Sequence, residues 1–116
     1  MSLQKQQTAF AWMLAEWLTW CKASGYEITL GEVYRTEEQQ ALYLKKGLSK
    51  TMKSKHRDRL ALDFNLFVGS ALAQVAQYRP LGEKWEELGG VWGGRFGVKI
   101  ENYATKIGWD AGHIEA

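Results

Sequence analysis

Three residues have side chains that could share one metal ion, and two of them are the only histidines of the chain. His56 and Asp63 lie seven residues apart, and His113 lies much later in the sequence. Two imidazoles and a carboxylate are the kind of ligand set that binds catalytic zinc, which keeps a fourth position for water. Our hypothesis is that His56, Asp63 and His113 hold one Zn²⁺ ion and that Asp110 handles a proton in the reaction.

The spacing between His56 and Asp63 sets a condition on the backbone. On one regular strand, residues an odd number apart face opposite sides. On one helix, the two residues would be about 10 Å apart along the axis. Both side chains can therefore reach one ion only if the chain turns between them, and the polar residues 55–59 suit such a turn.

An apolar strand is predicted directly after this turn. Its even-numbered residues are Leu60, Leu62, Phe64, Leu66 and Val68. Alternation at period two indicates that these residues face the core, whereas Asp63 lies on the other face among apolar neighbours. An unpaired charge there is costly. A metal cation would satisfy the carboxylate, but so would an ion pair with Arg57 or Arg59, which would leave His56 as an ordinary surface residue.

Four short motifs bear on this choice. They are Glu-x-Tyr-Arg-Thr at 32–36, Ser-x-His with Ala-x-Asp at 54–63, Trp-Gly-Gly at 92–94, and an acidic residue three before the last histidine at 110–113. In this order they resemble the zinc peptidases of the D-alanyl-D-alanine carboxypeptidase family, which includes phage L-alanyl-D-glutamate endopeptidases. The resemblance covers most of the chain. One departure is Arg59, where many members carry glycine, and it affects the expected shape of the turn.

The resemblance implies a catalytic role for five residues. His56, Asp63 and His113 would bind zinc, which activates water and polarises the scissile carbonyl. Asp110 would take a proton from the water and pass it to the leaving amine. Arg35 would stabilise the developing oxyanion.

The resemblance also implies a substrate-binding cleft. The residues expected to bind substrate are Ser54, Arg35, Gln39 and Trp92. The residues themselves leave alternatives open, because Arg35 could instead pair with Glu32 or Glu38, and Ser54 could only cap the turn.

Helices are predicted on both sides of the central strand. Apolar residues recur at helical spacing over residues 3–23, and Gly25 ends this helix. A capping box at residues 36–39 opens a second helix, which ends at Gly47, and Pro80 opens a third, which ends at residues 89–90. Short strands are expected at residues 26–30 and 113–115. Residues 69–78 are expected to form a loop, with a short helix as the alternative.

This order of elements suits an α+β fold with a small antiparallel sheet packed against helices. The 116 residues, 46% of them hydrophobic, predict a single domain over residues 1–116. By resemblance, this is a single-domain zinc peptidase of the D-Ala-D-Ala carboxypeptidase (hedgehog-like) type. The one cysteine, Cys21, excludes an internal disulfide and is expected to be buried.

Positive charge is concentrated between residues 45 and 59. The basic residues there are Lys45, Lys46, Lys50, Lys53, Lys55, Arg57 and Arg59. They form either a solvated loop or an electropositive rim that attracts an anionic polymer. Because no recognisable nucleic-acid-binding motif accompanies them, we expect no nucleic-acid partner.

The expected location follows from two further absences in the sequence. No apolar run approaches the roughly 20 residues of a membrane span, and residues 1–9 lack a signal-peptide pattern. We expect synthesis in the cytoplasm without a signal peptide, action on the cell wall after release, no stable membrane insertion, and a monomer.

The resemblance implies hydrolysis of a peptide bond in peptidoglycan, so that the expected partner is the stem peptide. A small single domain favours a phage or prophage endolysin-like enzyme that cuts the L-Ala–D-Glu bond. One alternative is a D-Ala-D-Ala carboxypeptidase or dipeptidase. An alternative of another class is a non-catalytic, zinc-containing cell-wall-binding or structural module.

Overall fold

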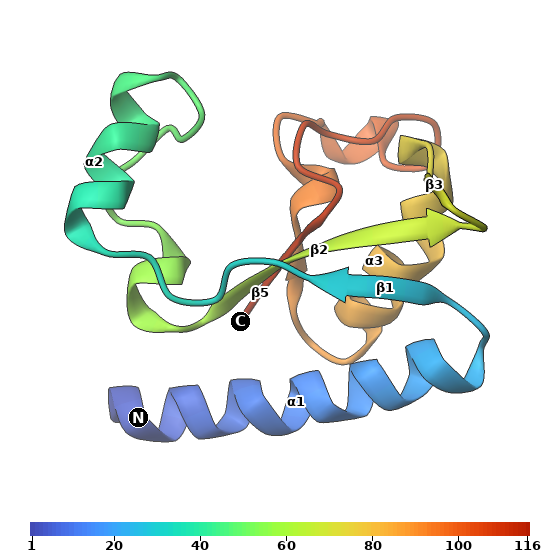
Figure 1. Ribbon diagram of the computed structural model, residues 1–116, viewed down its shortest axis with the longest axis horizontal. Coiled ribbons are helices and arrows are strands. Elements are labelled where there is room, and N and C mark those ends of the chain that lie inside the picture. The colour runs from blue at the N-terminus through green and yellow to red at the C-terminus, as the bar shows by residue number, and fades with distance from the viewer.

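An antiparallel sheet forms the centre of the computed structural model, which describes residues 1–116 (Figure 1). Its strands are β1 (Glu27–Leu30), β2 (Ala61–Val68), β3 (Ala71–Leu72), β4 (Val91–Trp92) and β5 (His113–Glu115). The strand order is β1-β2-β5-β4, β3 pairs with β2, and every pair is antiparallel. The predicted α+β class with a small antiparallel sheet is confirmed.

The two faces of β2 differ as the sequence predicted. Leu62, Phe64 and Leu66 are buried on one face, whereas Asp63 is half-buried on the other. Val68 departs from the pattern because it is 55% exposed at the end of the strand, where it pairs with Ala71 of the β3 hairpin.

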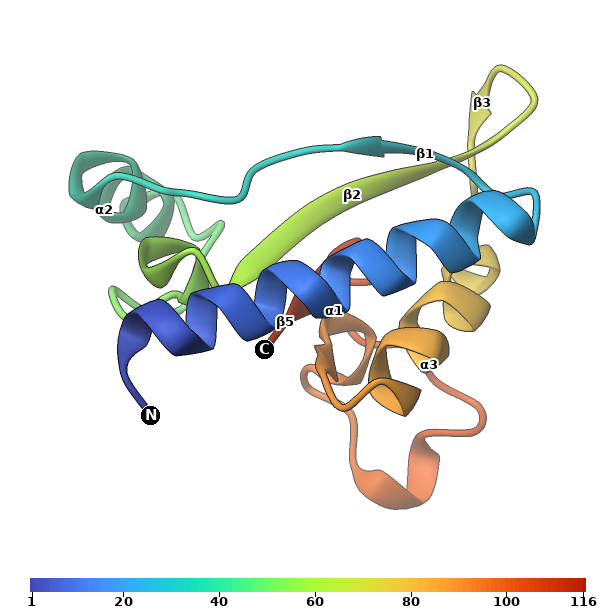
Figure 2. The same ribbon diagram turned by 90° about the horizontal axis from the view of Figure 1, so that it is seen from below.

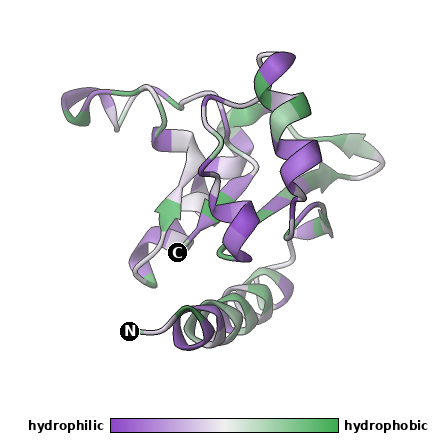
Figure 3. Cartoon of the chain, turned by 90° about the vertical axis from the view of Figure 1, so that its left-hand side faces the viewer, coloured by the Kyte–Doolittle hydropathy of each residue, from purple (hydrophilic) through white to green (hydrophobic).

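Two helices cover the apolar face of β2. The first, α1 (Leu3–Ala23), begins after Ser2, whose Oγ accepts a hydrogen bond from the backbone N–H of Lys5, and Gly25 follows it with a φ of 81°. The second, α3 (Arg79–Glu87), begins with Pro80 in its first turn. Figure 2 shows α1 running along β2, with α3 beside it. Figure 3 views α1 almost end-on and shows hydrophilic and hydrophobic residues side by side on it.

Aromatic side chains join these helices to the sheet. Trp17 of α1 is fully buried and packs edge-on against Phe64 and Trp85, with ring centroids 5.0 and 6.2 Å away. The indole N–H of Trp17 donates to the carbonyl of Leu81, and that of Trp85 donates to the carbonyl of Glu115. Each buried indole therefore has a partner for its polar group. Because the helices cover this face of β2, the face that carries Asp63 is left for a site.

The remaining helix, α2 (Glu37–Lys45), lies to one side of the sheet (Figure 1). Thr36 caps it, since its Oγ1 accepts from the backbone N–H of Gln39. Gly47, with a φ of 73°, follows its last turn. The predicted start and end of this helix are confirmed.

The prediction of a plain loop over residues 69–78 is wrong. The segment forms β3 and then a 3-10 turn, Val75–Tyr78. Tyr78 is buried, and its hydroxyl accepts from the backbone N–H of Leu66. This long-range bond to β2 has no counterpart in the local sequence pattern. Elsewhere, Cys21 is buried as expected, and none of the helices combines the length and apolarity needed to cross a bilayer.

Candidate metal centre and cleft

His56 is placed by the predicted turn. Residues Lys55–Asp58 form one 3-10 turn, and the Oγ of Ser54 caps it by accepting from the backbone N–H of His56 at 3.2 Å. The His56 side chain turns inward and the residue is only 1% exposed. The interpretation of His56 as an ordinary surface residue is therefore excluded.

Arg59 closes this turn in the left-handed conformation, with a φ of 57°. It is the only non-glycine residue of the chain with a positive φ. Glycine adopts this conformation without steric cost, so a glycine fits naturally at this position. The guanidinium carbon of Arg59 lies 4.2 Å from the ring centroid of Tyr34, and this cation–π contact offsets part of the backbone strain. The turn thus keeps its shape with arginine.

The sheet brings His113 to Asp63 although 50 residues separate them. The two residues are directly opposite each other on β5 and β2. Opposed residues of an antiparallel pair place their side chains on the same face, about 5 Å apart. Both side chains therefore project from the face of the sheet that α1 and α3 leave uncovered.

The three potential ligands meet at one point. Asp63 Oδ1 lies 3.1 Å from Nε2 of His56 and 3.2 Å from Nδ1 of His113. One ligand atom from each residue falls within a group no wider than 4.8 Å. Donors bound tetrahedrally to zinc at roughly 2.0–2.1 Å are about 3.3 Å apart. The donor set and its spacing thus fit zinc, and these three residues are positioned to bind a metal ion.

Each histidine uses its other ring nitrogen for a second partner. Nδ1 of His56 lies 3.0 Å from the carbonyl oxygen of Val33, and Nε2 of His113 lies 2.8 Å from Oε1 of Glu115. A ring N–H that donates to such an oxygen leaves the opposite nitrogen free for a metal, and it also fixes the ring orientation.

Hydrogen bonds link the charges of Asp63 and the two histidines in the metal-free centre. Burial opposes ionisation of Asp63, but hydrogen bonds from His113 and His56 outweigh it and hold the pKa of Asp63 well below its usual range. Burial also opposes a charge on His113, but hydrogen bonds to Asp63 and Glu115 raise the pKa of His113 to about 9. Asp63 is therefore an ionised ligand throughout the physiological range.

Asp110 lies beside the metal-site residues and comes close to His113. Its Oδ2 is 3.8 Å from Nδ1 of His113. Burial raises the pKa of Asp110 and outweighs the opposing effect of the charge on His113. The carboxyl group is about one-third exposed and lines the cleft described below.

Arg35 lies on the other side of the centre, where it forms an ion pair with Glu32 and also lines the cleft. Its Nε pairs with Oε1 of Glu32, and its Nη1 donates to Oε1 of Gln40 at 2.9 Å. Its Nη2 lies 3.6 Å from Oδ2 of Asp63. Tyr43 stacks on the guanidinium at 4.6 Å and donates to Glu32. The guanidinium is thus held in one orientation next to the metal centre.

A cleft of about 860 Å³ opens over these groups. Its lining includes the three metal-site residues, Arg35, Asp110 and Ser54, together with residues 48–51 and 53–55 from one side and Phe96 and Trp109 from another. In Figure 1, α2 and the segment after it lie to the left, beyond the start of β2, whereas the orange-to-red chain around residues 93–112 lies above β2. The volume is typical of a site for a small ligand or a short peptide.

A curated relative shares much of this sequence. The chain is 35% identical over 89 residues to the L-alanyl-D-glutamate peptidase of Listeria phage A118. The chain is therefore similar in sequence to one L-alanyl-D-glutamate peptidase. The match covers 73% of this chain but 32% of the relative, so the chain spans about a third of the length of that phage protein. No model of a protein family matches the sequence.

Solved structures show that the fold is that of this peptidase group. The L-Ala D-Glu endopeptidase ChiX of Serratia marcescens aligns with a TM-score of 0.59 and 20% identity, over 78% of this chain and 66% of ChiX. A variant of the D,D-pentapeptidase VanY from a VanB-type resistance cassette, in complex with Zn(II), aligns with a TM-score of 0.60 and 21% identity, over 91% and 69% of the two chains. The predicted resemblance to this group is confirmed.

Two residues that the peptidase motifs pointed to do not reach the cleft. Trp92 is fully buried on β4, and its Nε1 donates to the carbonyl of Ala111. Its ring leaves no room for a side chain at Gly82 or Gly94, where a Cβ would lie 2.1 and 2.2 Å from it. The prediction of Trp92 as a cleft wall is wrong, and Phe96 lines the cleft instead.

Gln39 was expected to bind substrate, but it does not line the cleft. The neighbouring Gln40 is fully buried and instead supports residues of the cleft. Besides accepting from Arg35, Gln40 donates to Oγ of Ser49 at 2.8 Å and to the carbonyl of Thr51. It therefore ties Arg35 to the segment that forms one side of the cleft. Only burial distinguishes the two glutamines, so the sequence carried no signal for this choice.

Proposed function

We propose that this chain is a zinc-dependent peptidase that hydrolyses the L-Ala–D-Glu bond of the peptidoglycan stem peptide. The observation that carries the proposal is the donor set of His56, Asp63 and His113 in a peptide-sized cleft, with Asp110 and Arg35 on either side. The name of the phage relative supports this substrate.

His56, Asp63 and His113 would hold the ion, which, when bound, supplies Lewis-acid activation of water and of the scissile carbonyl. Asp110 is the group placed to move the proton. Its carboxylate would take a proton from the attacking water and deliver it to the nitrogen of the leaving D-glutamyl residue. In the metal-free protein, burial raises the pKa of Asp110.

Arg35 is the group placed to stabilise negative charge. The guanidinium stays ionised and donates in a planar fork, which suits an oxyanion that develops on the L-alanyl carbonyl oxygen. Glu32 and Gln40 already hold two of its nitrogens, so the group does not need to be ordered when substrate binds. Ser54 lines the cleft and also caps the turn that carries His56. It would therefore help to bind the substrate and hold this turn in place.

A D-Ala-D-Ala carboxypeptidase is the second candidate. The D,D-pentapeptidase VanY shares the fold, and the same arrangement of metal ligands, base and arginine would serve either bond. The third candidate, a non-catalytic wall-binding module, would not require a partly buried, oriented arginine or Asp110 at the metal centre. We further propose that the chain acts as a monomeric single domain over residues 1–116 and reaches the cell wall after release from the cytoplasm.

The products formed from purified peptidoglycan test the proposal. Digestion by the zinc-loaded protein should create new amino termini of D-glutamate. Release of free D-alanine without D-glutamate termini would favour the carboxypeptidase instead. Zinc binding with no product of either kind would leave the non-catalytic module as the better account.

A further inference from the structure

The cleft has two chemically different walls. On one side, Lys50, Lys53 and Lys55 line it. All three residues are exposed, and none of them takes part in an ion pair. By contrast, Lys84 on α3 pairs with Glu87. The three ammonium groups are therefore free to bind an anion. We call them the lysine wall.

The other side of the cleft is mostly apolar. Phe96 and Trp109 contact each other with ring centroids 5.3 Å apart, and Trp109 is 58% exposed. Leu72 and Val75 also line the cleft and are more than half exposed. Two charged residues adjoin this aromatic pair in the sequence. Arg95 pairs with Glu83 and Glu86 and does not line the cleft, whereas Asp110 lines it and repels anions. A carboxylate in the cleft is therefore attracted to the lysine wall and disfavoured on the aromatic side.

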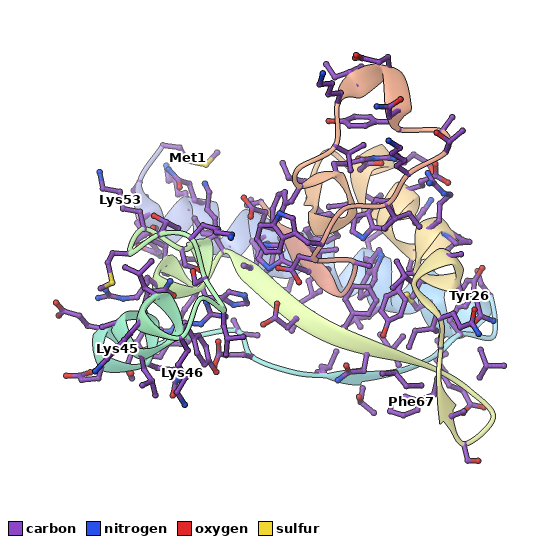
Figure 4. All side chains as sticks on the ribbon, turned by 90° about the horizontal axis from the view of Figure 1, so that it is seen from above. Met1, Tyr26, Lys45, Lys46, Lys53 and Phe67 are labelled. Atoms are coloured by element: carbon purple, nitrogen blue, oxygen red, sulfur yellow. The ribbon has the colours of Figure 1, made fainter.

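Not every lysine of the basic segment belongs to this wall. Lys45 and Lys46, at the end of α2, are equally exposed but do not line the cleft. Figure 4 shows Lys53 well apart from Lys45 and Lys46. The lysines of this basic segment therefore form two groups. Lys50, Lys53 and Lys55 line the cleft, whereas Lys45 and Lys46 lie outside it.

Resting on the proposed function, we propose that the lysine wall binds the free α-carboxylate of the D-glutamyl residue. The uncharged L-alanyl side of the scissile bond then lies along Phe96 and Trp109. This placement sets the direction of the stem peptide in the cleft. It also makes the enzyme prefer stem peptides whose D-glutamate is not amidated. Exposed ion pairs are individually weak, so three lysines together are expected to change affinity by about tenfold.

Two short peptides and two sets of variants test this inference. One peptide is N-acetyl-L-alanyl-γ-D-glutamyl-L-lysine amide, in which the α-carboxylate of D-glutamate is the only carboxylate. The other carries a carboxamide in its place. The test variant combines Lys50→Gln, Lys53→Gln and Lys55→Gln. The control combines Lys45→Gln and Lys46→Gln, which remove nearby charge outside the cleft. None of these lysines belongs to the proposed catalytic machinery.

The readouts are kcat/KM for each peptide and, separately from activity, the Kd of the product γ-D-glutamyl-L-lysine amide measured by calorimetry. For the carboxylate form, the triple variant should show a kcat/KM about tenfold lower and a product Kd about tenfold higher. For the carboxamide form, each quantity should change by less than twofold. The double control should change either form by less than twofold.

The inference is overturned if the triple variant cuts and binds both forms as well as the wild type does, or loses the same factor on both. In those outcomes the wild type still cleaves the peptides, so the proposed function stands. If the wild type neither cuts nor binds any of them, the proposed function fails together with this inference.

Discussion

Glu115 Oε1 lies 2.8 Å from Nε2 of His113, and His113 precedes Glu115 by two residues on β5. Alternate residues of a strand share a face, so the short strand that supplies a metal ligand also supplies its support. The carboxylate directs Nδ1 of His113 towards Asp63 and thereby completes the donor set.

Replacing Glu115 with alanine should therefore weaken zinc binding. Loss of such a hydrogen bond to a ligand histidine typically costs 10- to 100-fold in metal affinity. Competition with a chromogenic chelator would measure the change. Glu101→Ala is a matched control, because Glu101 is exposed and does not line the cleft. Equal zinc affinity in all three proteins would contradict the supporting role of Glu115.

Replacing Arg35 with lysine should separate charge from geometry. Lysine keeps the positive charge but cannot hold Glu32 and Gln40 while facing Asp63. We expect kcat to fall by roughly 10²- to 10³-fold with zinc content unchanged, as for other groups that stabilise an oxyanion. Steady-state kinetics on a stem peptide would measure it, with Arg59→Lys as the control outside the cleft. A variant that raises KM alone would argue for simple substrate binding.

Replacing Arg59 with glycine should leave stability nearly unchanged. Glycine removes the strain of the left-handed backbone but gives up the contact with Tyr34 and gains freedom in the unfolded chain. Release of the strain is worth about 1–2 kcal/mol, and the lost contact and the added freedom each cost about 0.5–1 kcal/mol, so the effects nearly cancel. Arg59→Ala keeps the strain, loses the contact and adds less freedom to the unfolded chain, so it should be less stable than the glycine variant by about 0.5–1 kcal/mol. Urea unfolding of the metal-free proteins would measure both, and an alanine variant more stable than the glycine variant would contradict this account of the turn.

The buried Cys21 predicts a loss of stability in alkali. Burial raises the pKa of Cys21 to about 12, well above that of a thiol in the unfolded chain. Between about pH 9 and pH 12 the folded state therefore holds a proton that the unfolded state releases, and stability falls as pH rises. The wild type should lose up to about 1.4 kcal/mol per pH unit more than Cys21→Ala over this range. Chemical unfolding at several pH values would test it, and parallel pH profiles would show that the thiol is not buried.

The sequence predicted most of the elements because their signals are local. The apolar period of α1, the cap at Thr36 and the alternation of β2 each appear within a few residues, and the structure has all three. The meeting of Asp63 and His113 was expected only through the family motifs, because strand register across 50 residues leaves no local pattern.

Two of the predictions that failed concern side-chain direction. Trp92 lies within one recognised motif and Gln39 follows another, but a motif does not show which side of a short strand or helix faces the cleft. The space beside Gly82 and Gly94 admits the indole of Trp92 into the core. The position of Gln40 one residue further along α2 turns its side chain, and not that of Gln39, beneath Arg35. Both outcomes depend on packing between distant segments.

Zinc content measured together with peptidoglycan cleavage tests the central claim most directly. The wild type and Asp110→Asn should each bind one zinc ion per chain, His56→Ala should bind none, and only the wild type should create D-glutamate amino termini. This result would support His56, Asp63 and His113 as ligands and Asp110 as the proton carrier. Cleavage at wild-type rates by either variant would contradict the proposed site.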